Sequence, residues 1–590
     1  MGKNINIMIG GEAGQGLVTI GQILAKSLVR AGYCIVVNQG YHSRIRGGHN
    51  TYAISVSTDD ISAPPPEPYS KGYDILVALD EPTNQQASMN LRDDGRNGLL
   101  IVDSEFSKTD WSNRLETPYK ELVAGKYQNI AALGIVAAIT GLDQNLVSVA
   151  VNDFFADHPE AIEDNSKALS ASYEWGANQI ADGKASLAGG GLDPAPTRGP
   201  RIVLNSNEAI ALGAISAGVK FCSFYPMTPA TSVPLNFIAN ACKMGIIVEQ
   251  AEDEISVINM ALGASYAGAR SMAATAGGGF ALMIEGVSLA GMIETPIVIV
   301  VGQRPGPATG MPTRTEQADL ELVLYAGHGE FPRAIFAPGT IEECFHLTRK
   351  AFEMAEKYQS PVFIMTDQYF SDSDRAVEPF DISDLDPIHV GANPDDIEEP
   401  YLRYKITENG VSPRLIPGTS KHLVIVDSDE HTEDGHLTED EGDRGAYAIN
   451  DKGEKVYLSI RRKMVEKRLR KMDGLKSEAV APEYGGDDNP DILLVSWGSS
   501  KGAVDEASCL LRGDGTRVGT LHFSQVWPLM PEQFIRHLES TKRTVMIESN
   551  ATGQMERLIH RETSFEFDKA IRRYDGLPIT SAYILDELGG

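Results

Sequence analysis

Short apolar runs alternate along most of the chain with longer segments in which apolar residues recur at helical spacing. The strand-length runs are residues 4–9, 34–38, 201–204, 221–224, 271–275, 296–301, 362–366, 492–496, 517–522 and 544–548. The helical segments between them include residues 17–31, 207–217, 282–293, 341–357, 502–511 and 531–538. Alternation of strands and helices is typical of parallel sheets covered by helices. The pattern therefore predicts an α/β protein with several doubly wound domains.

Changes in composition divide this pattern into domains. Residues 183–200 are rich in Gly, Ala and Pro and have no apolar periodicity, which predicts a linker. A second irregular stretch begins near residue 381 and contains an acidic segment and a basic segment. We therefore expect an α/β domain at residues 1–185, a linker at 186–200, a second α/β domain at 201–380, a connector at 381–485 with an acidic loop at 427–444 and a basic helix at 461–471, and a third α/β domain at 486–590.

The glycine-rich segment after the first strand matches neither common nucleotide-binding pattern. Gly11 and Gly16 fit the outer glycines of a P-loop, but Leu and Val follow where Lys and Ser or Thr are required. Further on, Arg44 and Arg46 stand beside paired glycines and could bind phosphate or carboxylate groups. The alternative is a surface loop whose arginines pair with acidic side chains of the same protein.

Glu254 begins a helical segment that is rich in Ala and Gly. Small residues at helical spacing allow a helix to lie very close to a neighbouring backbone or to a flat ligand. An extended segment, residues 271–275, and a glycine turn, residues 277–279, follow this helix. The order is therefore a carboxylate, a close-packing helix, a short strand and a glycine turn.

Two loops on either side of this segment carry further candidate residues. Prolines at positions 226 and 229 stiffen the turn around Thr228 and fix the position of its hydroxyl group. The alternative role for Thr228 is to cap the following helix. In the second loop Arg314 stands between two threonines, where it could bind a carboxylate bidentately. The alternative there is an ion pair with Glu316 or Asp319.

Net charge and apolar run length exclude two classes of function. The 590-residue chain carries a formal charge of −29, which disfavours nucleic acid and anionic membranes as partners. No apolar run is long enough to span a bilayer, and the first residues lack the features of a signal peptide. The chain is expected to be cytoplasmic.

No metal site is expected on the chain itself. The five cysteines are far apart, whereas a cluster would need about four thiolates. They are interpreted as buried, reduced thiols. Gly513-Asp-Gly515 looks like the start of a Mg²⁺–diphosphate motif, but it connects a helix to a strand and is interpreted as a turn. The histidines of the acidic loop lack helical ligand spacing, so a solvated, partly self-paired loop is favoured.

The order of elements after Glu254 resembles the pyrimidine-binding domain of thiamine diphosphate enzymes. The strings YPMTPAT (225–231) and GPATGMPTRTEQADL (306–320) are similar to alpha subunits of 2-oxoacid:ferredoxin oxidoreductases, most of all those that act on 2-oxoglutarate. The N-terminal glycines with RGGH resemble a gamma-type domain, here fused ahead of the alpha portion. The domain at residues 486–590 is similar to the C-terminal domain of transketolases, and residues 525–529 and 548–554 match the family there.

This resemblance implies a role for each candidate residue. Glu254 would bond N1′ of the aminopyrimidine ring, which promotes proton removal by the 4′-amino group. The substrate carboxylate would contact Thr228 and be clamped by Arg314, helped by Thr313 and Thr315. The remaining candidates are Tyr225, Pro226, Gly277 and Gly278 on the pyrimidine side of thiamine diphosphate, and Gly14, Gly16, Arg44 and Arg46 on the side of coenzyme A or of assembly.

The resemblance also implies an activity and partners. The expected reaction is oxidative decarboxylation of 2-oxoglutarate with coenzyme A to succinyl-CoA and CO₂; run in reverse it would fix carbon, as in a reductive TCA cycle. A beta subunit would hold Mg²⁺, the diphosphate and a [4Fe–4S] cluster, and ferredoxin would dock there because this chain is acidic. The expected assembly is an (αβ)₂ heterotetramer. Open alternatives are pyruvate or a branched-chain 2-oxoacid as substrate, or a non-catalytic assembly subunit.

Overall fold

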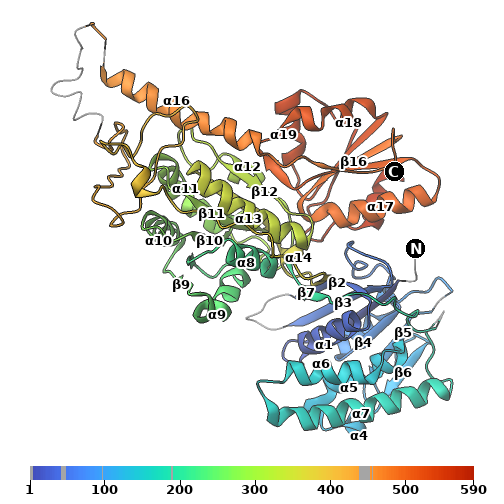
Figure 1. Ribbon diagram of the computed structural model, residues 1–590. Coiled ribbons are helices and arrows are strands. Elements are labelled where there is room, and N and C mark those ends of the chain that lie inside the picture. The colour runs from blue at the N-terminus through green and yellow to red at the C-terminus, as the bar shows by residue number, and fades with distance from the viewer. Residues whose placement is uncertain are drawn as a thin grey trace.

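Three β-sheets, of eight, seven and five strands, organise the molecule. The computed structural model describes residues 4–41, 48–95, 97–187, 190–437, 452–454 and 456–589. In Figure 1 the first sheet and its helices form one end of the molecule, coloured blue to cyan. The second and third sheets, green to yellow and orange to red, form the rest.

The first sheet has the strand order β6-β5-β4-β1-β3-β2-β14-β7. Its strands are β1 Ile5–Glu12, β2 Cys34–Tyr41, β3 His49–Ser57, β4 Ile75–Ala78, β5 Leu99–Asp103, β6 Arg114–Thr117, β7 Ile202–Leu204 and β14 Arg375–Val377. The helices that accompany it are α1 Leu17–Arg30, α2 Glu81–Gln85, α3 Ala87–Asn90, α4 Tyr119–Leu122, α5 Gln128–Thr140, α6 Gln144–Phe154 and α7 Pro159–Ala181, with a short 3-10 helix, η1, at Gly125–Tyr127.

The predicted strand–turn–helix–strand opening is present, but its two strands do not pair with each other. Strand β3 lies between β1 and β2 and runs antiparallel to both. The sequence of β3 shows the two-residue period of a strand, since Tyr52, Ile54 and Val56 alternate with smaller or polar residues and are fully buried. The first sheet is therefore mixed, because β1 also pairs with β4 in parallel.

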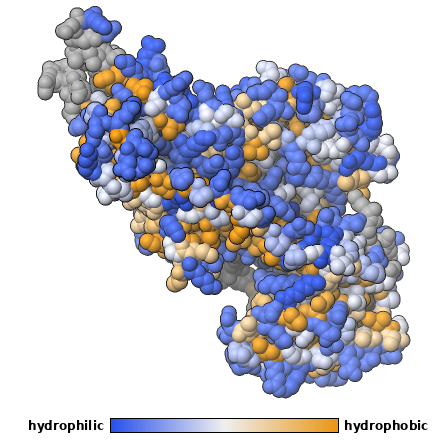
Figure 2. Space-filling model, viewed as in Figure 1, coloured by the Kyte–Doolittle hydropathy of each residue, from blue (hydrophilic) through white to orange (hydrophobic). Residues whose placement is uncertain are grey.

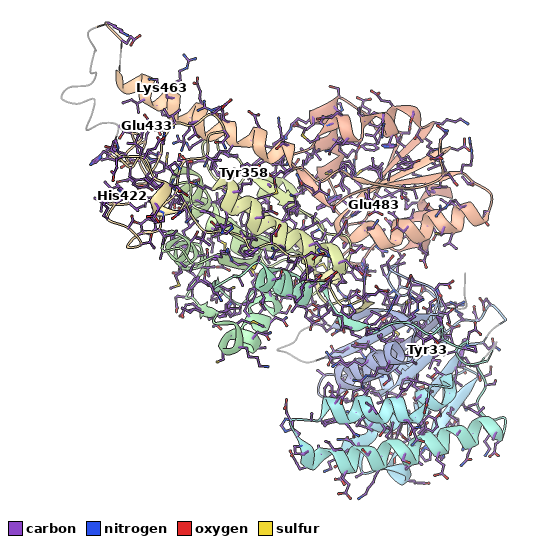
Figure 3. All side chains as sticks on the ribbon, in the orientation of Figure 1. Tyr33, Tyr358, His422, Glu433, Lys463 and Glu483 are labelled. Carbon is purple, nitrogen blue, oxygen red and sulfur yellow. The ribbon has the colours of Figure 1, made fainter. Side chains whose placement is uncertain are left out.

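The first sheet crosses the expected boundary at residues 186–200. Strand β14 pairs with β2 through Arg375 and Val36, and β7 pairs with β14. The linker also packs on this domain, because the hydroxyl of Tyr33 donates to the carbonyl of Asp193 at 2.7 Å. Figure 3 labels Tyr33 within the N-terminal domain. The two α/β units are thus joined by strand pairing as well as by the chain.

The second sheet has the order β18-β12-β13-β11-β10-β8-β9 and is parallel except for β18. Its strands are β8 Phe221–Phe224, β9 Ile247–Gln250, β10 Ser271–Ala276, β11 Ile297–Gln303, β12 Ala334–Phe336, β13 Pro361–Asp367 and β18 Gln525–Trp527. Its helices are α8 Ser206–Ser216, α9 Ser232–Met244, α10 Glu254–Tyr266, α11 Gly277–Met292, α12 Leu320–Leu324, α13 Ile341–Tyr358 and α14 Gln368–Ser371.

Both faces of this sheet are covered, as the continuous apolar run of β11 predicts. Val298 and Val300 face one core cluster, whereas Ile297, Ile299 and Val301 face the other. A sheet buried in this way fixes the carboxyl ends of its strands, where the candidate loops begin.

The third sheet has the order β15-β17-β16-β19-β20. Its strands are β15 Glu483–Gly486, β16 Ile492–Trp497, β17 Val518–Phe523, β19 Arg543–Glu548 and β20 Lys569–Arg572. Helices α16 Val456–Ser477, α17 Lys501–Gly513, α18 Ile535–Ser540, α19 Gln554–Thr563 and α20 Ser581–Gly589, and 3-10 turns η2 Pro394–Asp396, η3 Gly498–Ser500 and η4 Pro531–Gln533, complete the chain.

Two predictions in the C-terminal third have different outcomes. The single helix expected at 531–538 is wrong, because non-helical Phe534 separates a 3-10 turn from α18. The interpretation of residues 513–515 as a turn is confirmed, since α17 ends at Gly513 and Gly515 has a φ of +90° before β17. A positive φ favours glycine at such a turn.

The connector contains the expected pairing between the acidic and basic segments. Glu430 forms ion pairs with Arg461 and Arg468, the latter at 2.9 Å. Nearby His431 is buried and its ring stacks on Tyr404 with centroids 3.7 Å apart. Residues 438–451 of this region lie outside the described residues. In the part of the chain that the structure describes, no helix is long and apolar enough to cross a membrane.

Candidate active site

Glu254 is a buried carboxylate whose Oε1 atom has no hydrogen-bond partner among the described residues. Asp253 precedes it and caps α10 by accepting from the backbone N–H of Ser256 at 2.7 Å. This cap fixes Glu254 at the first helical position, where its side chain is only 3% exposed. Burial, with the nearby charge of Asp253, raises the pKa of Glu254. A buried polar atom without a partner is costly, so it indicates a place for a ligand.

The glycines at positions 277–279 begin α11, so the expected glycine turn is wrong. A Cβ atom at Gly279 would overlap Oε1 of Glu254 and Oγ1 of Thr275. A Cβ atom at Gly277 would overlap the carboxyl group of Asp319. Glycine is needed at these two positions because carboxyl groups lie against the backbone. No such crowding exists at Gly278, whose expected contact with thiamine diphosphate stays a prediction.

Asp319 and Arg304 belong to this neighbourhood and were missed at the level of the sequence. Oδ2 of Asp319 also has no hydrogen-bond partner among the described residues. Burial raises the pKa of Asp319 to about 6, against the opposing charge of Arg304. The guanidinium of Arg304 donates to the carbonyl oxygen of Thr228 at 2.8 Å. The sequence contains only a weak indication of a role for Asp319, namely its position directly before the short apolar segment of α12.

The turn at residues 225–231 follows β8 and leaves the Thr228 hydroxyl free. That hydroxyl makes no hydrogen bond within the described chain, and the first residue before α9 is Thr231 rather than Thr228. The alternative role of Thr228 as a helix cap is therefore wrong. Tyr225 is 39% exposed at the start of the turn, and Pro226 is exposed beside it.

Arg314 and Thr313 line a cavity of about 390 Å³ formed by all three α/β units. The Arg314 guanidinium makes no ion pair or hydrogen bond with the described residues, so the alternative pairing with Glu316 or Asp319 is absent there. Thr315 lies apart from this cavity: its side chain is buried, and its hydroxyl donates to Asp367 at 3.0 Å. The structure thus brings together two of the four residues expected around the substrate carboxylate, Thr313 and Arg314, whereas Thr228 and Thr315 do not line this cavity.

The N-terminal candidates are described only in part. Gly14 has a φ of +97° and open space around its Cα atom. Gly16 has a φ of +72°, precedes α1, and leaves no room for a Cβ atom beside Asn129. Both positions favour glycine for their backbone conformation. Arg44 and Arg46 lie outside the described residues, and the coenzyme A or assembly role of all four stays a prediction.

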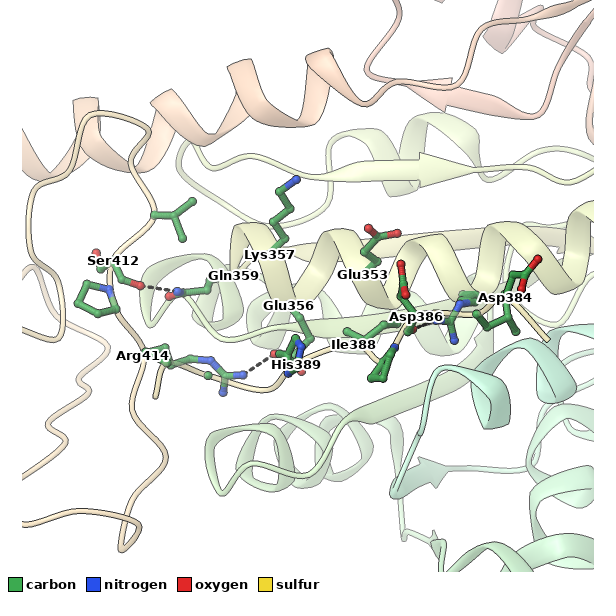
Figure 4. A pocket seen from close by; sticks show the side chains of 17 residues that line it. Glu353, Glu356, Lys357, Gln359, Asp384, Asp386, Ile388, His389, Ser412 and Arg414 are labelled. Carbon is green, nitrogen blue, oxygen red and sulfur yellow. Dashed lines mark hydrogen bonds and ion pairs between the residues drawn. The ribbon is translucent and has the colours of Figure 1, made fainter. Parts of the chain in front are cut away.

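A second cavity, of about 600 Å³, lies between α13 and the connector (Figure 4). Its charged groups are largely satisfied by the protein itself. Arg414 pairs with Glu356 at 2.5 Å, and Arg349 donates to the carbonyl of Asp386. Gln359 donates to the carbonyl of Ser412 at 2.6 Å. A cavity with its cations already paired is less suited to an anionic substrate than the cavity that holds Arg314.

The cysteines differ in their surroundings. Cys34, Cys222 and Cys344 are buried, as interpreted from the sequence, whereas Cys509 is half-buried and Cys242 is exposed. Among the described residues, no group of three or more His, Cys, Asp or Glu side chains is placed to hold a metal ion.

Comparisons with known proteins identify the family of this chain. Residues 212–447 match the family described as the thiamine diphosphate-binding domain of pyruvate flavodoxin/ferredoxin oxidoreductase. Residues 6–175 match the family described as pyruvate ferredoxin/flavodoxin oxidoreductase. The 2-oxoacid:ferredoxin oxidoreductase subunit alpha of Sulfolobus sp is 30% identical over 98% of this chain and 95% of its own length.

Two further relatives have more specific names. The 2-oxoglutarate oxidoreductase subunit KorA of Mycobacterium tuberculosis is 28% identical over 100% of this chain and 91% of its own. The structure of 2-oxoglutarate:ferredoxin oxidoreductase from Magnetococcus marinus, with 2-oxoglutarate, coenzyme A and succinyl-CoA bound, matches with a TM-score of 0.89. It is 28% identical, and the match covers 100% of this chain and 99% of that one. The chain belongs to the family of alpha subunits of 2-oxoacid:ferredoxin oxidoreductases.

Proposed function

We propose that this alpha subunit takes part in oxidative decarboxylation of 2-oxoglutarate, with coenzyme A, to succinyl-CoA and CO₂. The names of the Mycobacterium tuberculosis and Magnetococcus marinus relatives support this substrate. The single observation that carries the proposal is the unpartnered Oε1 atom of buried Glu254 beside the glycine start of α11. These residues fit one half of a thiamine diphosphate site.

The chemistry assigned to this chain is proton control and substrate binding. Thiamine diphosphate, when bound, supplies the nucleophilic carbon that attacks the keto carbon and the electron sink for decarboxylation. Glu254 would hold a proton at N1′ of the aminopyrimidine ring, which its burial favours. Arg314, with Thr313 and Thr228, would orient the substrate carboxylate. Thr315 would contribute indirectly, by its bond to Asp367.

The remaining groups would come from a beta subunit. We place the diphosphate, Mg²⁺, a [4Fe–4S] cluster and ferredoxin docking on that partner, within an (αβ)₂ assembly in the cytoplasm. Exposed apolar residues around the Glu254 helix would form part of its contact face: Leu235, Ile238, Ile247, Ile255, Met260 and Leu282. Figure 2 shows apolar residues gathered on the region that holds α8 and α10. Large exposed apolar patches mark interaction sites.

The test is purification of the chain with its natural partner, followed by analysis for iron, sulfide and thiamine diphosphate. Coenzyme A-dependent dye reduction is then measured on 2-oxoglutarate, pyruvate and a branched-chain 2-oxoacid. Fastest turnover of 2-oxoglutarate supports the proposal. A preference for another acid would assign the chain to the broader 2-oxoacid group, and a lone, inactive, iron-free chain would favour a non-catalytic subunit. Reduced ferredoxin with succinyl-CoA and CO₂ tests the carbon-fixing direction.

A further inference from the structure

The cavity that contains Arg314 is also lined by acidic side chains, but these are already paired. Glu67 and Asp575 both contact Arg573, whose guanidinium donates to Glu67 at 2.9 Å and to Asp575 at 3.0 Å. Glu67 also accepts from the hydroxyl of Thr580 at 2.8 Å. Arg573 compensates one of these two carboxylate charges, and neither carboxylate forms an ion pair with Arg314 among the described residues.

His49 lines the same cavity, and a buried carboxylate holds its ring. It is the first residue of β3, and its Nδ1 atom lies 3.0 Å from Oδ2 of Asp80. Asp80 is 6% exposed and is itself fixed, because it caps α2 by accepting from the backbone N–H of Thr83. An aspartate that accepts from Nδ1–H sets the ring orientation and leaves Nε2 available. Nε2 makes no hydrogen bond with any described residue.

The Arg314 guanidinium and Nε2 of His49, which have no hydrogen-bond partner among the described residues, thus belong to one cavity wall but come from different domains. Arg314 comes from the second α/β unit and His49 from the first. We propose that His49 contacts the distal carboxylate of a dicarboxylic 2-oxoacid whose keto-acid end is bound by Arg314. Asp80 acts as a positioning residue for His49. A hydrogen bond from His49 to the distal carboxylate would distinguish a second carboxylate from an alkyl tail. This inference rests on the proposed function.

The test uses the assembled enzyme and compares 2-oxoglutarate with pyruvate and 2-oxobutyrate. In His49→Asn the amide nitrogen can replace Nδ1 against Asp80, while the donor at Nε2 is lost. We expect kcat/KM for 2-oxoglutarate to fall about 10- to 100-fold, the range for a hydrogen bond to a charged group, and to change less than about twofold for the monocarboxylic acids. His49→Gln, which can restore a donor near Nε2, should recover part of the loss.

The matched control is His158→Asn, which changes an exposed histidine before α7. It should leave every rate constant unchanged. Equal losses on all acids, or a loss confined to the KM for coenzyme A, would overturn the role of His49, as would an unchanged substrate preference. A wild-type enzyme that oxidises pyruvate but not 2-oxoglutarate would overturn the proposed function instead. The substrate preference of the wild type is therefore measured before any variant is made.

Discussion

Two buried glutamates lie near opposite ends of α11, and among the described residues only Glu294 forms ion pairs. Glu254 lies beside the first turn, is 3% exposed, and has a free Oε1 atom. Glu294 follows the last turn, is 1% exposed, and forms ion pairs with Lys467, at 2.6 Å, and Lys471. Both lysines come from α16. Their ion pairs with Glu294 hold α16 against the second α/β unit.

The difference is the one expected between a proposed ligand site, at Glu254, and a structural ion pair, at Glu294. Burial acts on both carboxyl groups to raise their pKa values. At Glu294 the charges of Lys471, Lys467 and Arg403 outweigh burial and lower the pKa, whereas at Glu254 burial outweighs the effect of a backbone hydrogen bond and the pKa is raised. A buried ion pair contributes specificity when each charge is compensated. An uncompensated carboxylate contributes only if a ligand completes it.

The largest expected effect is on catalysis at Glu254. Glu254→Gln keeps the size of the side chain but cannot share a proton with N1′. We expect kcat to fall about 10²–10⁴-fold, the usual range for a lost acid–base group. The complex should still assemble, and its unfolding midpoint should not decrease, because no ion pair is lost. Normal turnover in this variant would contradict the assignment of Glu254.

The matched substitution at the other end of α11, Glu294→Gln, should lower the stability of the protein. Glu294→Gln leaves two buried lysines without a counter-charge, and we expect the free energy of unfolding to fall by about 3–5 kcal/mol. The folded fraction should keep the wild-type kcat within about twofold. Denaturant unfolding and active-site-normalised rates separate the two effects. Loss of activity with unchanged stability would mean that Glu294 belongs to the active site.

The pH dependence of stability should have opposite slopes for the two glutamates. Because the folded-state pKa of Glu254 is raised, the wild type should lose stability relative to Glu254→Gln as the pH rises from about 4.5 through that raised value. Because the folded-state pKa of Glu294 is lowered, the wild type should lose stability relative to Glu294→Gln as the pH falls below about 4.5. Unfolding midpoints measured from about pH 3 to about pH 8 include both pH ranges, and parallel slopes would contradict the comparison.

The sequence makes Glu254 a candidate residue but gives no indication of the ion pairs of Glu294, and the reason is the range of the interactions. Glu254 is recognisable because its cap, its helix and the glycines of α11 lie within about thirty residues of each other along the chain. Lys467, a partner of Glu294, lies 173 positions away along the chain. No nearby sequence pattern predicts that pairing. The same limit explains why the pairing of Thr315 with Asp367, in the adjoining strand β13, escaped prediction.

Strands and helices with a strong local period were predicted well, and elements defined by tertiary pairing were not. Strands β8, β10, β11 and β16 follow the predicted runs within about two residues at each end. The short strands β7 and β14 are held by their pairing with the first sheet. The local sequence could not predict that these strands connect the two domains. The helical start at Gly277 was hidden because glycine has a low helix propensity.

The smallest expected effect distinguishes two threonines in the same way as the two glutamates. The Thr228 hydroxyl has no hydrogen-bond partner among the described residues, whereas that of Thr315 donates to buried Asp367. Thr228→Val should raise KM for the 2-oxoacid about tenfold, equivalent to one hydrogen bond of about 1.4 kcal/mol, without changing stability. Thr315→Val should instead lower the free energy of unfolding by about 1 kcal/mol and leave KM unchanged. If both variants changed only KM, Thr315 would act on the substrate as the resemblance implies. The hydrogen bond from Thr315 to Asp367 would then not indicate a structural role.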